Sequence, residues 1–178
     1  MFDFGEGPVP AHRHVNGGGW IADTAQVEPT AYVGPDARVY GQAHVSGDAR
    51  VGDHAKVYNG AHVYDHARIS GQTKVCNGAH VYGQAWVSGN AWVSGNARVS
   101  GNARVYDRAW VSGHAEISGD AGVGDHARVY GQARVDGQAR VDGHARVDGD
   151  AGIGGAESVS PSPDMSLEEE FFSRIGGS

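Results

Sequence analysis

Three histidines with a constant spacing are the residues best suited to chemistry in this sequence. Equal intervals of three hexads separate His44, His62 and His80. Histidine titrates near neutral pH and is the commonest metal ligand in proteins, so the set is a candidate for a metal site or a general base. Whether the three rings can act together depends on the elements that position them.

A six-residue repeat supplies those elements. Val or Ile occupies every sixth position from Val15 to Ile153, 24 times without an insertion or deletion. Ala stands four places after the apolar residue at 21 of the 22 positions from 25 to 151, with Thr73 as the exception. Gly, Asp or Asn stands two places after it at 21 of the 23 positions from 23 to 155. The unit is therefore A-x-V-x-[GDN]-x.

Each position of the repeat has a physical reason. Ala and Val two residues apart give the alternation of a strand with one buried face. Gly, Asp and Asn tolerate the positive φ of a tight corner. An apolar period of six does not match a helix, whose period is close to 3.6 residues. The repeat predicts an all-β coil with flat sides, in which short strands alternate with corners.

The repeat resembles that of the hexapeptide-repeat proteins, from Val15 to about Gly155. The resemblance implies a single-stranded, left-handed parallel β-helix with the shape of a triangular prism and three hexads in each coil. The 24 hexads then make about eight coils. The left-handed sense comes from the resemblance alone, because the general rule for parallel crossovers favours right-handed connections.

A coil of three hexads sorts the outward side chains into three columns. Two columns place tryptophans next to Lys or Arg, so we expect cation–π contacts and a surface on which protein partners dock. The alternative is that these large side chains only cover the sheet and stabilise it by a few tenths of a kcal/mol each. The predicted partner-binding residues in the columns are Trp86, Trp92, Trp110, Arg68, Arg104 and Arg128.

The third column holds the three histidines, which are weak metal candidates. Stacked strands place their rings about 4.8 Å apart in a line, whereas the ligands of one zinc ion converge to about 2 Å from it. A subunit interface, as in the γ-class carbonic anhydrases of this fold, would have to add ligands. Acyltransferases of the family use an extruded loop, for which the unbroken repeat leaves no room. We therefore assign no catalytic residue and no cofactor, and keep such an enzyme as the alternative function.

The two ends differ from the repeat. Residues 1–14 are expected to form an N-terminal cap or docking arm, with Phe2, Phe4 and Val9 as its apolar residues. The β-helix is expected over 15–157, a Ser/Pro linker over 158–165 and a short amphipathic helix over 166–178. Ser166 and Glu169 form a capping box, and the apolar face of this helix would cap the last coil or bind a partner through Leu167, Phe171, Phe172 and Ile175.

Composition excludes several classes of function. The net charge of −7 gives no reason to expect general nucleic-acid binding. The single Cys76 allows no internal disulfide. No apolar run approaches the roughly 20 residues of a membrane span, and no signal peptide is recognisable, so we expect a cytoplasmic protein, or a virion protein if a phage encodes it.

The preferred function is a non-enzymatic scaffold that self-associates or docks to a larger assembly. Its repeat resembles the polymer-forming bactofilins and, more closely, regular A-x-V-x-G-x proteins often encoded by bacteriophages and prophages. A homo-oligomer is expected, with a trimer as one arrangement.

Overall fold

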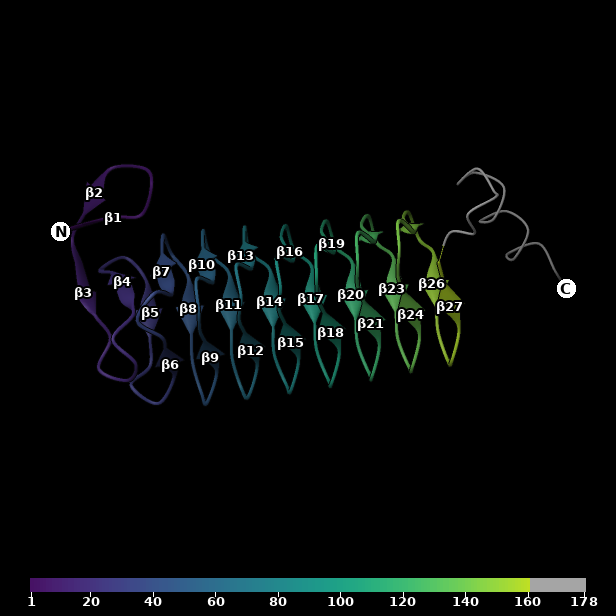
Figure 1. Ribbon diagram of the computed structural model, residues 1–178, viewed down its shortest axis with the longest axis horizontal. Helices are drawn as coiled ribbons and strands as arrows, with labels where there is room; N and C mark the ends of the chain where they lie inside the picture. Colours follow the sequence, from purple (N-terminus) through teal and green to yellow (C-terminus); the bar gives the residue numbers. More distant parts are fainter. Residues whose placement is uncertain (161–178) are drawn as a thin grey trace, which may run out of the picture.

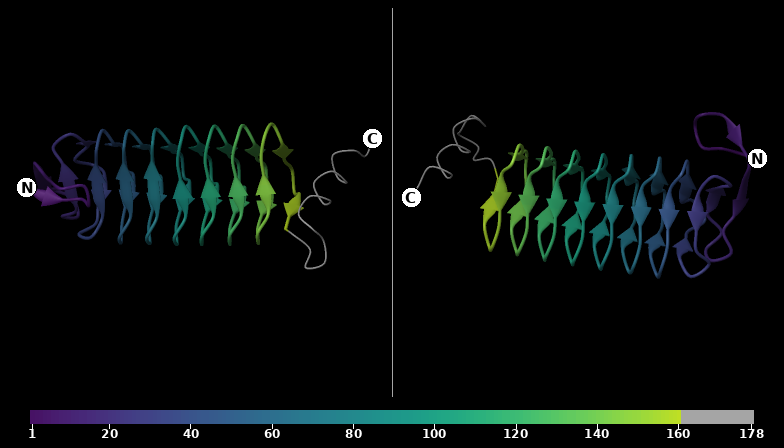
Figure 2. Two further views of the ribbon diagram at one scale, coloured as in Figure 1. Left: turned by 90° about the horizontal axis from the view of Figure 1, so that it is seen from above. Right: turned by 180° about the vertical axis from the view of Figure 1, so that it is seen from behind.

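Figure 1 shows a computed structural model in which short strands stack along a straight rod. The structure describes residues 1–160. Three sheets run the length of the rod, parallel except where the N-terminal strand joins one of them, and successive strands of the repeat pass from one sheet to the next (Figures 1 and 2). The predicted all-β parallel β-solenoid of about eight coils is confirmed. Among residues 1–160 we find no helix with the length and apolar character that crossing a bilayer requires.

The strands of the three sheets recur in turn along the chain. The nine-stranded sheet contains β3 (Ala11–Arg13), β4 (Trp20–Ala22), β7 (Arg38–Tyr40), β10 (Lys56–Tyr58), β13 (Lys74–Cys76), β16 (Trp92–Val93), β19 (Trp110–Val111), β22 (Arg128–Val129) and β25 (Arg146–Val147). One eight-stranded sheet contains β5 (Gln26–Val27), β8 (His44–Val45), β11 (His62–Val63), β14 (His80–Val81), β17 (Arg98–Val99), β20 (Glu116–Ile117), β23 (Arg134–Val135) and β26 (Gly152–Ile153). The other contains β6 (Tyr32–Val33), β9 (Arg50–Val51), β12 (Arg68–Ile69), β15 (Trp86–Val87), β18 (Arg104–Val105), β21 (Gly122–Val123), β24 (Arg140–Val141) and β27 (Ser158–Val159).

The register of these sheets is one coil, which equals three hexads. Lys56 pairs with Lys74, and His62 pairs with His80. Outward residues therefore form columns along the rod, as expected from the resemblance to hexapeptide-repeat proteins.

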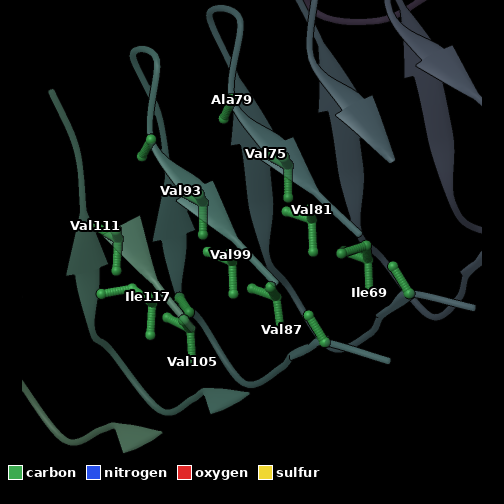
Figure 3. Close-up of a cluster of buried hydrophobic side chains, with 14 of the residues drawn as sticks. Ile69, Val75, Ala79, Val81, Val87, Val93, Val99, Val105, Val111 and Ile117 are labelled. Atoms are coloured by element: carbon green, nitrogen blue, oxygen red, sulfur yellow. The ribbon is translucent and has the colours of Figure 1, made fainter. Parts of the chain in front are cut away.

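The interior consists of the Val, Ile and Ala positions of the repeat. Val75, Val93 and Val111 project into it from one sheet, opposite the valines of the other two (Figure 3). From Val33 to Val141 the Val and Ile side chains are at most 1% exposed. Thr73, the one break in the Ala series, is also fully buried, and its hydroxyl has no partner among the described residues.

The corners have positive φ at the Gly, Asp or Asn position, as expected. Gly89 has φ of 71° and Asp107, one coil later, has φ of 56°. The coils approach closely here, because a Cβ placed on Gly89 would lie 2.8 Å from the backbone nitrogen of Asp107.

The first coil is covered by the N-terminal residues. β1 (Phe2–Asp3) and β2 (Pro8–Val9) form an antiparallel pair, and β3 pairs antiparallel with β4. Phe4 is buried, and the ring of Phe2 stacks on Trp20 at 4.4 Å between centroids. Val9, expected among the covering residues, is 39% exposed.

Both boundaries of the repeat differ from the prediction. Val15, expected as its first inward residue, lies in a turn and is 83% exposed. The chain folds back after β3, and Ile21 is the first buried apolar residue of the series. At the other end, β27 lies inside the predicted linker and pairs with β24. The predicted helix over 166–178 lies outside the described residues.

Candidate binding surfaces

Each sheet carries a different set of outward side chains, from which we name its face. The tryptophan face carries Trp20, Arg38, Lys56, Lys74, Trp92, Trp110, Arg128 and Arg146. The histidine face carries Gln26, His44, His62, His80, Arg98, Glu116, Arg134 and Gly152. The arginine face carries Tyr32, Arg50, Arg68, Trp86, Arg104, Gly122, Arg140 and Ser158.

The tryptophan face contains a continuous aromatic and cationic stack. The rings of Trp92 and Trp110 lie 5.4 Å apart and are 8° from parallel. The Lys74 ammonium lies 5.3 Å from the centroid of the Trp92 ring, and the Arg128 guanidinium lies 5.5 Å from that of Trp110. These are the cation–π contacts expected from the sequence, and the cations on this stretch of the face cover ring surfaces of the protein itself.

A second column on this face was missed by the sequence reasoning. It consists of the residues that directly follow a Val, among them Tyr40 and Tyr58, whose ring centroids lie 4.9 Å apart. Phe4 of the N-terminal segment stacks on Tyr40, also at 4.9 Å between centroids. Cys76 continues the column, is buried and accepts a hydrogen bond from Trp92 Nε1 at 3.2 Å. Burial, and then the hydrogen bond with Cys76, raise the pKa of Tyr58. The three-hexad period, applied to the position after each Val, places Tyr40, Tyr58 and Cys76 in this column.

The histidine face holds its three rings in a parallel stack. The centroids of His44 and His62 are 5.1 Å apart, and those of His62 and His80 are 4.7 Å apart with an angle of 3° between the rings. Burial, and then the charge of His44, lower the pKa of His62, while burial, His62 and Arg98 lower the pKa of His80. Parallel stacking keeps the ring nitrogens in a line, so they do not converge on one point.

No group of three or more His, Cys, Asp or Glu side chains suited to a metal ion occurs within residues 1–160. The positive charges on the histidine face are paired within it. Glu116 lies 3.4 Å from an Arg98 nitrogen and 3.6 Å from an Arg134 nitrogen.

The arginine face differs from the sequence expectation at Trp86. Arg68 and Arg104 are its neighbours in register, as predicted. However, in the described part of the chain neither guanidinium lies over the Trp86 ring. The ring instead donates a hydrogen bond from Nε1 to the Ser70 hydroxyl at 3.2 Å, and the side chain is 44% exposed.

Tyr106 crosses the arginine face farther along the rod. Its hydroxyl donates to the Asp142 carboxylate at 2.9 Å, two coils away. Its ring lies over Gly124, where a Cβ would be only 2.2 Å from the Tyr106 ring. Burial, and then the Asp142 hydrogen bond, raise the pKa of Tyr106 to about 12.

A pocket of 540 Å³ lies near the N-terminal end of the arginine face. Tyr32, Arg50 and Arg68 come from the face itself, and His66 and Asp48 come from the adjoining corner. His66 Nδ1 lies 3.5 Å from the Asp48 carboxylate. Asn16 and Thr30 complete the lining.

Comparison with known proteins supports the repeat architecture. Residues 97–113 match the family model described as YdcK Beta solenoid repeat. The matched span covers about one coil and includes residues of all three faces. A search of the curated proteins finds no match to the chain.

The structure brings the predicted partner-binding residues into two groups. Trp92, Trp110 and Arg128 share the tryptophan face, whereas Arg68, Trp86 and Arg104 share the arginine face. The predicted tail residues Leu167, Phe171, Phe172 and Ile175 lie outside the described residues.

Proposed function

We propose that this β-solenoid is a non-enzymatic structural module that self-associates through its tryptophan face. The observation that carries the proposal is the stacked pair of Trp92 and Trp110, which are 36% and 38% exposed on a flat sheet. Aromatic residues and Arg are enriched at the centres of protein interfaces. Because the sheet fixes both rings, docking costs little side-chain entropy.

The ends of the rod support a second contact, with a larger assembly. β25 and β26 are edge strands, and within the described chain no strand pairs with their far sides. Ile153 and Val159, which close the interior at this end, are only partly buried. An unpaired parallel edge with apolar residues behind it favours strand addition by a partner.

The resemblance to hexapeptide-repeat proteins supports the further proposal that the coil is left-handed. The likeness in repeat style to phage-encoded proteins supports a virion or phage accessory role. In this proposal, the tail residues Leu167, Phe171, Phe172 and Ile175 form the apolar face of a helix that docks at the open end or on a partner.

The test is the mass of the protein in solution, measured by light scattering over a range of concentrations. We expect a mass above the 18.6 kDa of one chain, reduced in the double variant Trp92→Ala, Trp110→Ala. Trp86→Ala is the matched control, because Trp86 is similarly exposed but lies on another face. A monomeric mass at all concentrations, or equal loss of mass in the control, would contradict the proposal.

A further inference from the structure

The arginine face presents positive charges that the protein itself does not use. Arg50, Arg68 and Arg104 are exposed and lie in one column. Among residues 1–160, none of these three guanidinium groups forms an ion pair or a cation–π contact. On the tryptophan face Lys74 and Arg128 cover rings, and on the histidine face Arg98 and Arg134 pair with Glu116. The contrast indicates that the arginine column is available to a partner.

The surroundings of this column are unusual for an acidic protein. The chain has 21 Asp and Glu residues, yet none lies between Asp65 and Asp107. The arginine face is bordered in these coils by uncharged groups that donate and accept hydrogen bonds: Ser70, Gln72, Gln84, Ser88, Asn90 and Asn102. The partner that fits is therefore anionic and rich in hydroxyl groups.

Aromatic rings complete the surface. Trp86 stands between Arg68 and Arg104, and Tyr32 forms part of the pocket beside Arg50 and Arg68. The pocket volume of 540 Å³ lies within the range of about 300 to 1,000 Å³ that is typical of small-ligand sites. It is large enough for a single sugar ring.

We propose that the arginine face binds a linear polysaccharide that carries carboxylate groups. Arg50 and Arg68 lie on adjacent strands, about 4.8 Å apart, and Arg104 lies two strands beyond Arg68, with Trp86 between them. The sugars of an extended polysaccharide repeat at a similar interval, so successive sugars meet Arg50, Arg68, Trp86 and Arg104 in turn. Arg binds a carboxylate through two parallel hydrogen bonds. The bordering amides and hydroxyls bind sugar hydroxyls, and the rings of Tyr32 and Trp86 pack on the apolar faces of sugars.

The alternative polyanion, single-stranded nucleic acid, would also use Arg and aromatic rings. We favour the polysaccharide because single-stranded nucleic acid is bound by successive aromatic rings on which its bases stack, whereas the column from Arg50 to Arg104 holds one ring, that of Trp86. Asp48, Asp53 and Asp65 lie at corners near the N-terminal end of the arginine column, and Asp107 lies at a corner just beyond Arg104. Asp48 itself lines the pocket and lies 3.5 Å from His66 Nδ1, so a chain bound there places its carboxylates at the guanidinium groups and its hydroxyl groups toward Asp48. The site is independent of the proposed self-association, which uses another face.

Calorimetric titration of the full chain tests the site. The probes are oligogalacturonate and oligomannuronate long enough to span the rungs from Arg50 to Arg104. We expect both to bind, and the double variant Arg68→Ala, Arg104→Ala to weaken binding by at least about tenfold, because each lost charged hydrogen bond is worth that much. The pair Arg68→Lys, Arg104→Lys, which retains the charge but not the paired hydrogen bonds, should give an intermediate affinity.

The matched control is Lys74→Ala, Arg128→Ala, which removes the same charge from the tryptophan face. We expect this pair to change the affinity less than about twofold, and an uncharged oligogalactoside not to bind. Circular dichroism establishes that each variant keeps its β-structure. Failure of both acidic probes to bind, or equal weakening by the two Ala pairs, would overturn the proposal. Tighter binding of oligothymidylate with the same dependence on Arg68 and Arg104 would replace the polysaccharide with nucleic acid.

Discussion

At the scale of single residues, the corner positions restrict the sequence most tightly. Residues there need positive φ, and the next coil lies directly above them. Asp is accommodated at some corners. Asp53 has a positive φ, and its carboxylate accepts a hydrogen bond from the Gly71 N–H of the next coil at 2.8 Å. Ala is disfavoured at a corner, because its backbone is strained at positive φ and its methyl group cannot accept a hydrogen bond from the next coil.

Gly89→Ala tests this requirement. We expect the free energy of unfolding to fall by about 1 to 3 kcal/mol, because φ is 71° and the new Cβ would lie 2.8 Å from the backbone of Asp107. Urea unfolding followed by circular dichroism measures the change. Gly152→Ala is the control: a Cβ added there would meet no atom within 4 Å and the φ is not positive, so no loss is expected. Equal loss at both positions would show that the corner has no special role.

At the scale of elements, most outward contacts join neighbouring coils, but Tyr106 joins two that are not adjacent. Its ring spans from β18 across β21, where Gly122 and Gly124 leave space, to Asp142 beside β24. The two glycines at β21 and the tyrosine below them thus form one unit, although 36 residues separate the hydrogen-bonded pair.

Tyr106→Phe makes the link measurable through pH. In the folded protein the pKa of Tyr106 is raised from the ordinary value of 10.0 to about 12. The unfolded chain loses the Tyr106 proton first, so the contribution of the raised pKa is complete below pH 10 and is lost as the pH rises toward 12. We expect Tyr106→Phe to be less stable than the natural protein below pH 10, and the difference to shrink by about pH 12. A difference that does not depend on pH would contradict the assignment.

At the scale of the whole molecule, the two ends of the rod are not equivalent. β1, β2 and β3 cover the first coil, and Pro8 and Pro10 lie in the covering segment, where they offer no N–H group to another strand. The last coil instead leaves β25 and β26 without a neighbouring strand on one side within residues 1–160. Association through chain ends is therefore expected at one end only.

A chain truncated after Ser160 tests what the tail does at that end. We expect its mass in solution to exceed that of the full chain, with small-angle X-ray scattering showing longer particles, because the tail no longer competes for the edges of β25 and β26. Introducing Trp92→Ala and Trp110→Ala into the truncated chain separates end contacts from face contacts. An unchanged mass would assign the tail to a partner instead of its own last coil.

Much of the fold was predictable, because the period of six and the alternation of Ala and Val indicate short strands and corners, and the resemblance to hexapeptide-repeat proteins implies three hexads in each coil. The three-hexad register, the columns and the corner φ values were all predictable. The exposure of Val15 was not predictable from the repeat, because Gly17, Gly18 and Gly19 allow the chain to reverse before the first coil. The hydrogen bond from Trp86 to Ser70 was not predictable either. Spacing determines which residues are neighbours, but the side-chain rotamers determine which of them are in contact.

The uniform interior has one more consequence, for alignment of the coils. A shift of the chain by one whole coil replaces Val with Val and Ala with Ala except at Ile69, Thr73 and Ile117, so most of the core does not distinguish the native pairing from a slipped one. The distinctive contacts lie at the beginning, where the buried His14 ring contacts the Ala31 carbonyl at 2.9 Å. The contacts of the N-terminal turn therefore define the register in which the first coils pair. Gain or loss of one whole coil would leave the pattern of the interior largely unchanged.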